Sequence, residues 1–319
     1  MKKVGTIFLV LIVILAVIGA GAYFLIRSKF PETGDTEITE GYYEKFSSDG
    51  ELEMKYSQLG EYEVAYTEIP SDNGSIQRIR FWYPSELERN DRQYPAIMVV
   101  NASGTPAASY EPFFERLASW GFIVIGNEDG QTGTGETASI TLEAVLDLEE
   151  TVIAGRIDTD NMGIIGYSQG GAGALAALTE YENGKIYKAV FTGSAAYPFM
   201  AGNFGWKYDV AKVRIPYFMT AGTGKSDDAG VKDITKEYGG VCPLESLVEN
   251  YNSIGADVMK IRARAAGAEH EQMLMRTDGY MTAWMLFHLQ GNEEAGKAFL
   301  TEEAEILHNS NWQDVEKNA

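Results

Sequence analysis

The chain of 319 residues is poor in three kinds of residue: it has one cysteine, three histidines, and 26 lysines and arginines against 46 acidic residues. The single cysteine, Cys242, excludes an intramolecular disulfide, so cross-links of this kind cannot stabilise the fold. The formal net charge of −20 argues against a nucleic-acid partner, because binding to phosphates needs clustered Lys and Arg. The same charge argues against a domain that lies flat on an anionic membrane, and it favours a neutral substrate.

Charged residues are also absent from residues 5–26, which form a nearly continuous apolar run. As a helix this run would be ~33 Å long, enough to span the hydrocarbon core of a bilayer. A cleavable signal peptide usually has an apolar run of only ~7–15 residues, so we expect residues 1–29 to form an uncleaved membrane anchor. The small residues at 20–22 leave cleavage and secretion as the alternative. Because the N-terminal tail is short and basic, we expect the rest of the chain to lie outside the cytoplasm; a cytoplasmic domain on the same anchor is the alternative.

Three further segments follow from composition. Residues 30–60 are polar, acidic and rich in Gly, Ser and Thr, which is typical of a linker. Residues 61–305 are long enough for one α/β domain. Residues 306–319 have the composition of an acidic, polar tail.

Within the predicted domain, short apolar runs alternate with segments that suit helices. Unbroken apolar runs are typical of strands that are buried on both faces, as parallel strands are. We expect strands at residues 62–69, 76–83, 96–100, 122–125, 162–166, 188–191, 217–220 and 258–263. We expect helices at residues 110–120, 141–154, 170–179, 244–251 and 280–289. This alternation predicts a three-layer α/β fold with a mostly parallel central sheet.

The segment Gly166-Tyr167-Ser168-Gln169-Gly170 matches the G-x-S-x-G pattern of a nucleophile elbow. It directly follows a predicted strand and precedes a helix of small residues, which is the context that the pattern requires. The flanking glycines lack the Cβ atoms that would clash in a strained turn, and a helix N-terminus favours developing negative charge. We therefore predict that Ser168 is a nucleophile rather than an ordinary N-cap residue.

A serine nucleophile needs a base, and the three histidines differ in context. His288 lies inside a predicted helix, where a structural role is expected, and His308 lies in the predicted tail. His270 lies in a loop between the last predicted strand and the last long helix. This is the place that the hydrolase order of serine, acid and histidine gives to the base, so we predict His270.

The carboxylate that orients the histidine should follow a strand between the nucleophile and the base. The strand at residues 217–220 leads into a loop that contains Asp227 and Asp228. Either residue can be the acid, and we favour Asp227. Asp257 is a weaker candidate, because it precedes a predicted strand rather than following one.

An oxyanion hole needs two backbone N–H groups that point at the same oxygen atom. One is expected from Gln169, the residue after the nucleophile. The other is expected from the loop at residues 101–105, with Ala102 as the first choice and Ser103 as the second. An ordinary Gly-containing βα loop is the alternative interpretation of residues 101–105.

Taken together, these segments resemble the α/β-hydrolase superfamily, and within it the dienelactone-hydrolase and cutinase-like branch, which includes polyester hydrolases. The similarity is carried by Tyr94-Pro95, the 101–105 loop, the run Leu117-Ala118-Ser119-Trp120-Gly121-Phe122, the elbow, and His270 followed by Ala283-Trp284. It covers about residues 60–300. The chain departs from the family in having Asn101-Ala102 where His-Gly or Pro-Gly is usual before the oxyanion donor.

The resemblance implies a serine esterase that hydrolyses carboxylic esters through an acyl-enzyme, with no metal and no organic cofactor. The expected substrate is a small-molecule or lipid-like ester, and the expected membrane contact is the N-terminal helix. A serine peptidase or an acyltransferase can use the same three side chains. A non-catalytic interaction domain on a membrane stalk is the remaining alternative.

Overall fold

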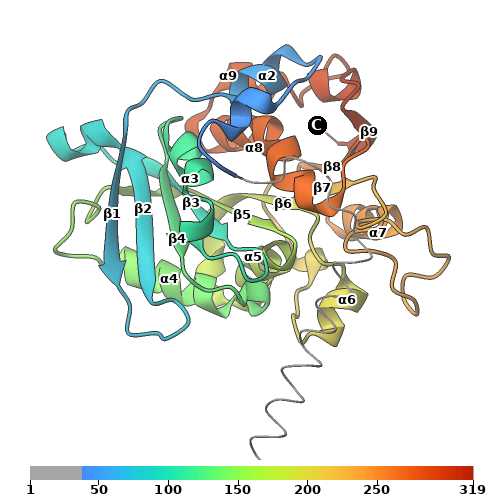
Figure 1. Cartoon of the computed structure of the whole chain (residues 1–319), viewed down its shortest axis with the longest axis horizontal. Coiled ribbons are helices and arrows are strands. Elements are labelled where there is room, and N and C mark those ends of the chain that lie inside the picture. The colour runs from blue at the N-terminus through green and yellow to red at the C-terminus, as the bar shows by residue number, and fades with distance from the viewer. Residues whose placement is uncertain (1–37, 319) are drawn as a thin grey trace, which may run out of the picture. The chain divides into compact units, whose positions relative to one another are not determined.

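A mixed β-sheet lies at the centre of residues 38–318, the part of the chain that this computed structural model describes (Figure 1). Its strand order is β1-β2-β4-β3-β5-β6-β7-β8-β9. The strands are Val64–Pro70 (β1), Arg78–Pro84 (β2), Tyr94–Val100 (β3), Ile123–Asn127 (β4), Ile157–Tyr167 (β5), Tyr187–Gly193 (β6), Tyr217–Gly222 (β7), Lys260–Ala265 (β8) and Trp312–Lys317 (β9). Neighbours from β4 to β8 are parallel, and antiparallel pairs occur at both edges of the sheet. This confirms the predicted α/β class with a mostly parallel sheet.

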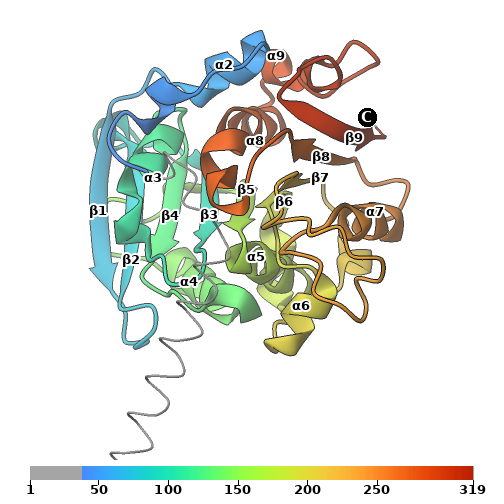
Figure 2. The same ribbon diagram turned by 45° about the vertical axis from the view of Figure 1, so that its right-hand side comes forward.

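Helices cover both faces of the sheet (Figures 1 and 2). On β3, Ile97 and Val99 belong to one apolar cluster and Ala96 and Met98 to another, because successive side chains of a strand point to opposite faces. Helices α2, α3, α8 and α9 contribute to the first cluster, and α4, α5 and α7 to the second. The helices are Glu51–Ser57 (α2), Glu111–Ala118 (α3), Glu136–Leu146 (α4), Gln169–Glu180 (α5), Pro198–Asn203 (α6), Leu244–Ser253 (α7), Met273–Gln290 (α8) and Glu293–Gly296 (α9).

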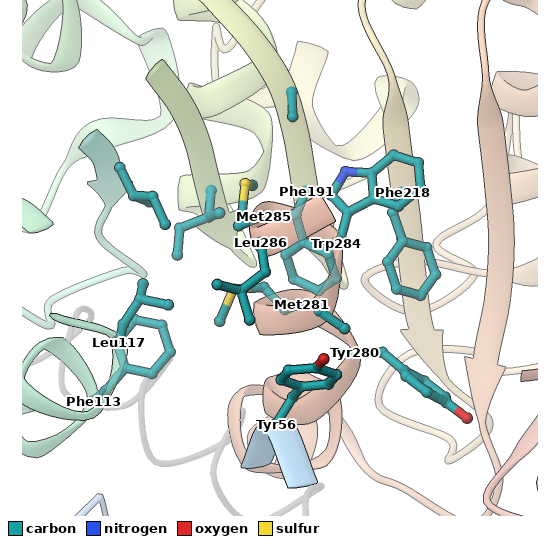
Figure 3. Close-up of a cluster of buried hydrophobic side chains, with 14 of the residues drawn as sticks. Tyr56, Phe113, Leu117, Phe191, Phe218, Tyr280, Met281, Trp284, Met285 and Leu286 are labelled. Atoms are coloured by element: carbon teal, nitrogen blue, oxygen red, sulfur yellow. The ribbon is translucent and has the colours of Figure 1, made fainter. Parts of the chain in front are cut away.

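Helix α8 contributes aromatic and methionine side chains to the first apolar cluster (Figure 3). The ring of Trp284 lies 5.7 Å from that of Phe218, and its Nε1–H donates a hydrogen bond to the carbonyl oxygen of Val190. His288 packs against Trp284, and burial lowers the pKa of His288 to about 4. This histidine is therefore a neutral side chain of the core near neutral pH. Since α8 begins just after His270, its packing also fixes the end of the predicted base loop.

The predicted membrane anchor at residues 1–29 lies outside the described residues. Among residues 38–318, no helix combines the length and the apolar character that a membrane span needs. The described residues belong to a unit that begins at Thr36.

The predicted linker at residues 30–60 is wrong from residue 38 onward. A 3₁₀ turn, Tyr42–Lys45, and helix α2 form there, and both Tyr42 and Tyr56 are fully buried. The carboxylate of Glu305 accepts hydrogen bonds from the backbone N–H groups of Leu52 and Glu53, at 2.8 and 2.9 Å. A side chain from the far end of the chain thus satisfies the first turn of α2, which composition could not reveal.

The predicted tail at residues 306–319 contains β9, which pairs antiparallel with β8. Its Trp312 is buried and donates its Nε1–H to Glu53 at 2.6 Å. Asn309 donates to the same carboxylate at 2.7 Å. The last part of the chain is therefore the edge of the sheet and not a free tail.

Helix α4 begins earlier in the sequence than the predicted helix at residues 141–154. Gly135 adopts the left-handed conformation and turns the chain, so that the helix begins at Glu136.

Candidate active site

Ser168 lies in the sharp turn between β5 and α5, with φ 57° and ψ −123°. This conformation is strained for a residue with a side chain, and strain of this kind is common where a nucleophile must project from a turn. A Cβ atom on Gly166 would lie 2.1 Å from the carbonyl oxygen of Gly170, and one on Gly170 would lie 2.1 Å from that of Val100. The two glycines of the motif are therefore required by close backbone contacts.

The structure brings Ser168, His270 and Asp227 together at the carboxyl end of the parallel strands. His270 begins the 3₁₀ turn His270–Gln272, and its Nε2 lies 2.9 Å from Oγ of Ser168. Its Nδ1 lies 2.7 Å from Oδ1 of Asp227. These are hydrogen-bonding distances, and they order a hydroxyl, an imidazole and a carboxylate as nucleophilic catalysis by a serine requires.

Asp227 is fully buried and is held by two further donors. The backbone N–H of Gly222 donates to its Oδ2 at 2.6 Å, and the hydroxyl of Ser194 donates to the same oxygen. The alternative acid, Asp228, forms an ion pair with Arg264 at 2.7 Å instead. Of the two predicted candidates, the structure brings only Asp227 to the histidine.

The charge around His270 favours its protonated form. Burial alone would lower the pKa of the imidazole, but the charge and hydrogen bond of Asp227, together with the charge of Glu271, outweigh burial. The pKa of His270 is therefore raised above its usual 6.5. An imidazolium that forms when Ser168 loses its proton is thereby stabilised.

Ser226 and Glu269 connect the acid loop to the base loop, and sequence reasoning missed both. The backbone N–H of His270 donates to Oγ of Ser226 at 2.7 Å, and the backbone N–H of Ser226 donates to Glu269 at 3.0 Å. The hydroxyl of Ser226 also donates to Glu269, and although burial opposes the shift, these hydrogen bonds lower the pKa of Glu269. The sequence offered one signal for these two residues, which is that Ser226 directly precedes Asp227 and Glu269 directly precedes His270.

The predicted oxyanion donors lie around the same serine. Ala102 and Ser103 line one cavity with Ser168, and Gln169 is the first residue of α5, where helix N–H groups lack acceptors within the helix. The hydroxyl of Ser103 donates to Oε1 of Gln169 at 2.6 Å, which ties the two donor segments together. Asn101, which departs from the family pattern, is buried and donates its Nδ2–H to two carbonyl oxygens, those of residues 127 and 129. These hydrogen bonds fix the start of the 101–105 loop against the end of β4 and the segment that follows it.

Comparison with known families adds an independent line of evidence. Residues 51–203 match the family described as PETase, PET hydrolase-like. The similarity to this family therefore covers just under half of the chain. The matched part contains the elbow and the 101–105 loop, while Asp227 and His270 lie beyond it. A stretch of 88 residues is 40% identical to Lipase 1 of Moraxella sp. (strain TA144). This alignment covers 27% of the chain and spans 28% of the length of that curated relative.

The cavity beside Ser168 has a volume of about 610 Å³, a size typical of small-molecule sites. Ser168 and His270 lie in its wall, so a substrate inside it can reach both. Much of the remaining wall is apolar. Its apolar and aromatic lining residues are Ile38, Ala102, Tyr110, Tyr167, Met273 and Leu274. The cavity can therefore hold a reacting carbonyl group beside an apolar substituent.

Proposed function

We propose that this PET hydrolase-like protein is a carboxylic ester hydrolase that works through an acyl-enzyme on Ser168. The observation that supports this most is the pair of contacts made by His270, 2.9 Å to the Ser168 hydroxyl and 2.7 Å to the Asp227 carboxylate. One imidazole can then accept a proton on Nε2 while its Nδ1–H stays bonded to the acid.

The reaction has two halves. In the first, Nε2 of His270 takes the proton from Ser168 as Oγ attacks the ester carbonyl carbon. The N–H groups of Gln169 and Ala102, or Ser103 in place of Ala102, stabilise the oxyanion. His270 then gives its proton to the leaving alcohol and the acyl-enzyme remains.

In the second half, His270 takes a proton from water, and the resulting hydroxide attacks the acyl carbonyl carbon. Collapse of this second tetrahedral intermediate breaks the bond to Oγ, returns the proton to Ser168 and releases the acid. Asp227 accepts a hydrogen bond from Nδ1–H throughout and stabilises the imidazolium without itself taking the proton.

The proposed substrate is a neutral, apolar ester. The apolar lining of the cavity and the net charge of −20 both disfavour an anionic substrate. The PET hydrolase-like family and the relative named Lipase 1 support the same class.

The direct test is a panel of p-nitrophenyl esters and peptide substrates, assayed with the wild type and Ser168→Ala. We expect ester turnover by the wild type and a loss of at least about 10³-fold in Ser168→Ala. Ser253→Ala is the matched control, because that hydroxyl lies on α7 and bonds only the carbonyl of Glu249. Equal turnover by Ser168→Ala and the wild type, or cleavage of peptides alone, would overturn the proposal.

We also propose that residues 1–29 anchor the protein in a membrane and hold the described domain outside the cytoplasm. The uncharged run at residues 5–26 supports this, and signal cleavage with secretion is the alternative. Alkaline extraction of membranes, followed by protease treatment of intact cells, tests both points. A protein that stays in the membrane pellet and is digested from outside fits the proposal; one released by alkali, or protected from the protease, contradicts it.

A further inference from the structure

Ile38 and Thr39 line the same cavity as Ser168 and His270. Of the residues that line it, these two are the most distant from Ser168 in sequence. Ile38 is partly buried and packs against the apolar cluster to which helices α3 and α8 contribute. Thr39 is exposed beside it. A substrate in the cavity therefore meets the segment that precedes the first helix of the described chain.

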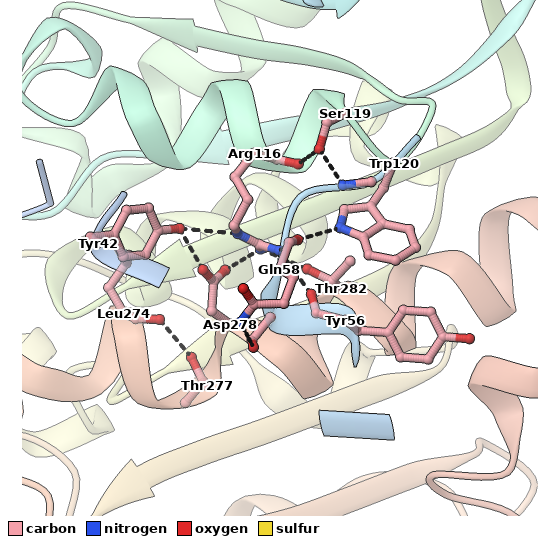
Figure 4. Close-up of polar contacts among 12 residues, drawn as sticks. Tyr42, Tyr56, Gln58, Arg116, Ser119, Trp120, Leu274, Thr277, Asp278 and Thr282 are labelled. Carbon is pink, nitrogen blue, oxygen red and sulfur yellow. Dashed lines mark hydrogen bonds and ion pairs between the residues drawn. The ribbon is translucent and has the colours of Figure 1, made fainter. Parts of the chain in front are cut away.

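A buried polar cluster fixes this segment in place (Figure 4). The hydroxyl of Tyr42 donates to the carboxylate of Asp278 and accepts from Nε of Arg116 at 3.1 Å. Arg116 and Asp278 also form an ion pair with each other, and all three side chains are at most 2% exposed. Because buried polar groups are costly to leave unpaired, the cluster holds Tyr42 in one position.

Further contacts extend this attachment. Arg116 donates to the carbonyl oxygens of Tyr56 and Gln58, at 2.8 and 3.4 Å, so it binds the N-terminal segment at three points. Gly41, with φ 71°, makes the turn between the cavity wall and Tyr42 in a conformation that other residues rarely adopt.

The same cluster reaches the reacting groups. Asp278 lies on α8, whose first two residues, Met273 and Leu274, line the cavity directly after the His270 turn. Tyr42 therefore connects the segment at Ile38 to α8. This helix supplies one wall of the cavity and begins directly after the His270 turn. The segment and the base keep a fixed spacing, which is what a selective site needs.

We propose that Ile38 and Thr39 are specificity-determining residues that limit the size of the ester group the cavity accepts, with Tyr42 as their positioning residue. This inference rests on the proposed ester hydrolysis. A group that is short fits beneath the segment without contact, whereas a long or bulky group is pressed against Ile38. Truncating Ile38 enlarges the cavity where that group lies and leaves the serine and histidine untouched.

The test compares kcat/KM for p-nitrophenyl acetate and p-nitrophenyl octanoate in the full chain. For Ile38→Ala we expect the octanoate-to-acetate ratio to rise about 10-fold, as a few methylene groups in an apolar pocket allow. Ile38→Val should change it in the same direction by less. Leu59→Ala, at an exposed leucine of the same N-terminal part, is the matched control. It should keep the wild-type ester ratio and the wild-type rate of Ser168 labelling by a small fluorophosphonate.

Tyr42→Phe separates positioning from contact. It removes the hydroxyl but not the ring, so we expect the ester ratio to move as in Ile38→Ala, together with a lower Tm. A ratio that is unchanged or lower in Ile38→Ala, with a wild type that hydrolyses both esters, overturns this inference and leaves the proposed function intact. A wild type that turns over neither ester and is not labelled at Ser168 overturns the proposed function, and the inference with it.

Discussion

Replacing Asp227 by asparagine tests the geometry of the candidate site at one atom. The carboxylate accepts three hydrogen bonds, from Nδ1–H of His270 on one oxygen and from Gly222 and Ser194 on the other. Asparagine offers only one oxygen. If it faces Gly222 and Ser194, its NH₂ group points at Nδ1 of His270, and only the tautomer with the proton on Nε2 can accept this hydrogen bond.

That tautomer places a proton between Nε2 and the Ser168 hydroxyl, so the histidine cannot act as a base. The opposite orientation sets an NH₂ group against two donors and leaves buried polar groups unsatisfied, which costs about 1–3 kcal/mol for each group. We therefore expect Asp227→Asn to fold and to lose about 10⁴-fold in kcat, or about 5.4 kcal/mol of transition-state stabilisation.

The neighbouring residue provides a matched control. Asp228→Asn removes the same charge one residue away, but its carboxylate is paired with Arg264 and does not contact His270. We expect it to leave kcat near the wild-type value and to lose about 1–3 kcal/mol of stability, because the pair with Arg264 is largely buried. Steady-state kinetics with p-nitrophenyl acetate and thermal unfolding of all three proteins give the answer. Loss of activity in Asp228→Asn with Asp227→Asn still active would refute the reasoning.

The remaining predictions concern pH and stability. Since Glu271 helps to raise the pKa of His270 against the effect of burial, Glu271→Gln should lower that pKa and move the acid limb of the kcat/KM profile to lower pH; an unmoved limb contradicts this. Trp312→Ala should lower the free energy of unfolding by about 3–5 kcal/mol in urea titrations, because β9 is part of the sheet; a change below 1 kcal/mol would restore the view of a free tail. Arg116→Ala should destabilise by about 3–5 kcal/mol, because it leaves the Asp278 carboxylate buried and unpaired, and denaturant unfolding at neutral pH measures this.

The parts of the fold that sequence predicted correctly are those whose signals are local. The elbow is specified by five consecutive residues, and the steric need for Gly166 and Gly170 follows from the turn itself. The buried strands are equally local, because each is an apolar run of a few residues. His270 could be predicted as the base because the chain has only three histidines, and the other two lie in a predicted helix and in the predicted tail.

The parts that it missed depend on partners far away in the chain. Leu52 is capped by Glu305, 253 residues away, and Glu53 meets Trp312 across 259 residues. Residues 38–60 and 306–319 are polar, so no periodicity marks them as packed. The choice between Asp227 and Asp228 was open for a related reason, since it depends on Arg264 in a neighbouring strand.

We infer that the hydroxyl of Ser168 is activated by the imidazole of His270. The most direct test of this activation is fluorophosphonate labelling followed by intact-mass and peptide mass spectrometry of the wild type, Ser168→Ala and His270→Ala. We predict one adduct per chain, on the peptide that contains Ser168, with none in Ser168→Ala and much slower labelling in His270→Ala. An adduct on another residue, or a labelling rate that ignores the loss of His270, would contradict this inference.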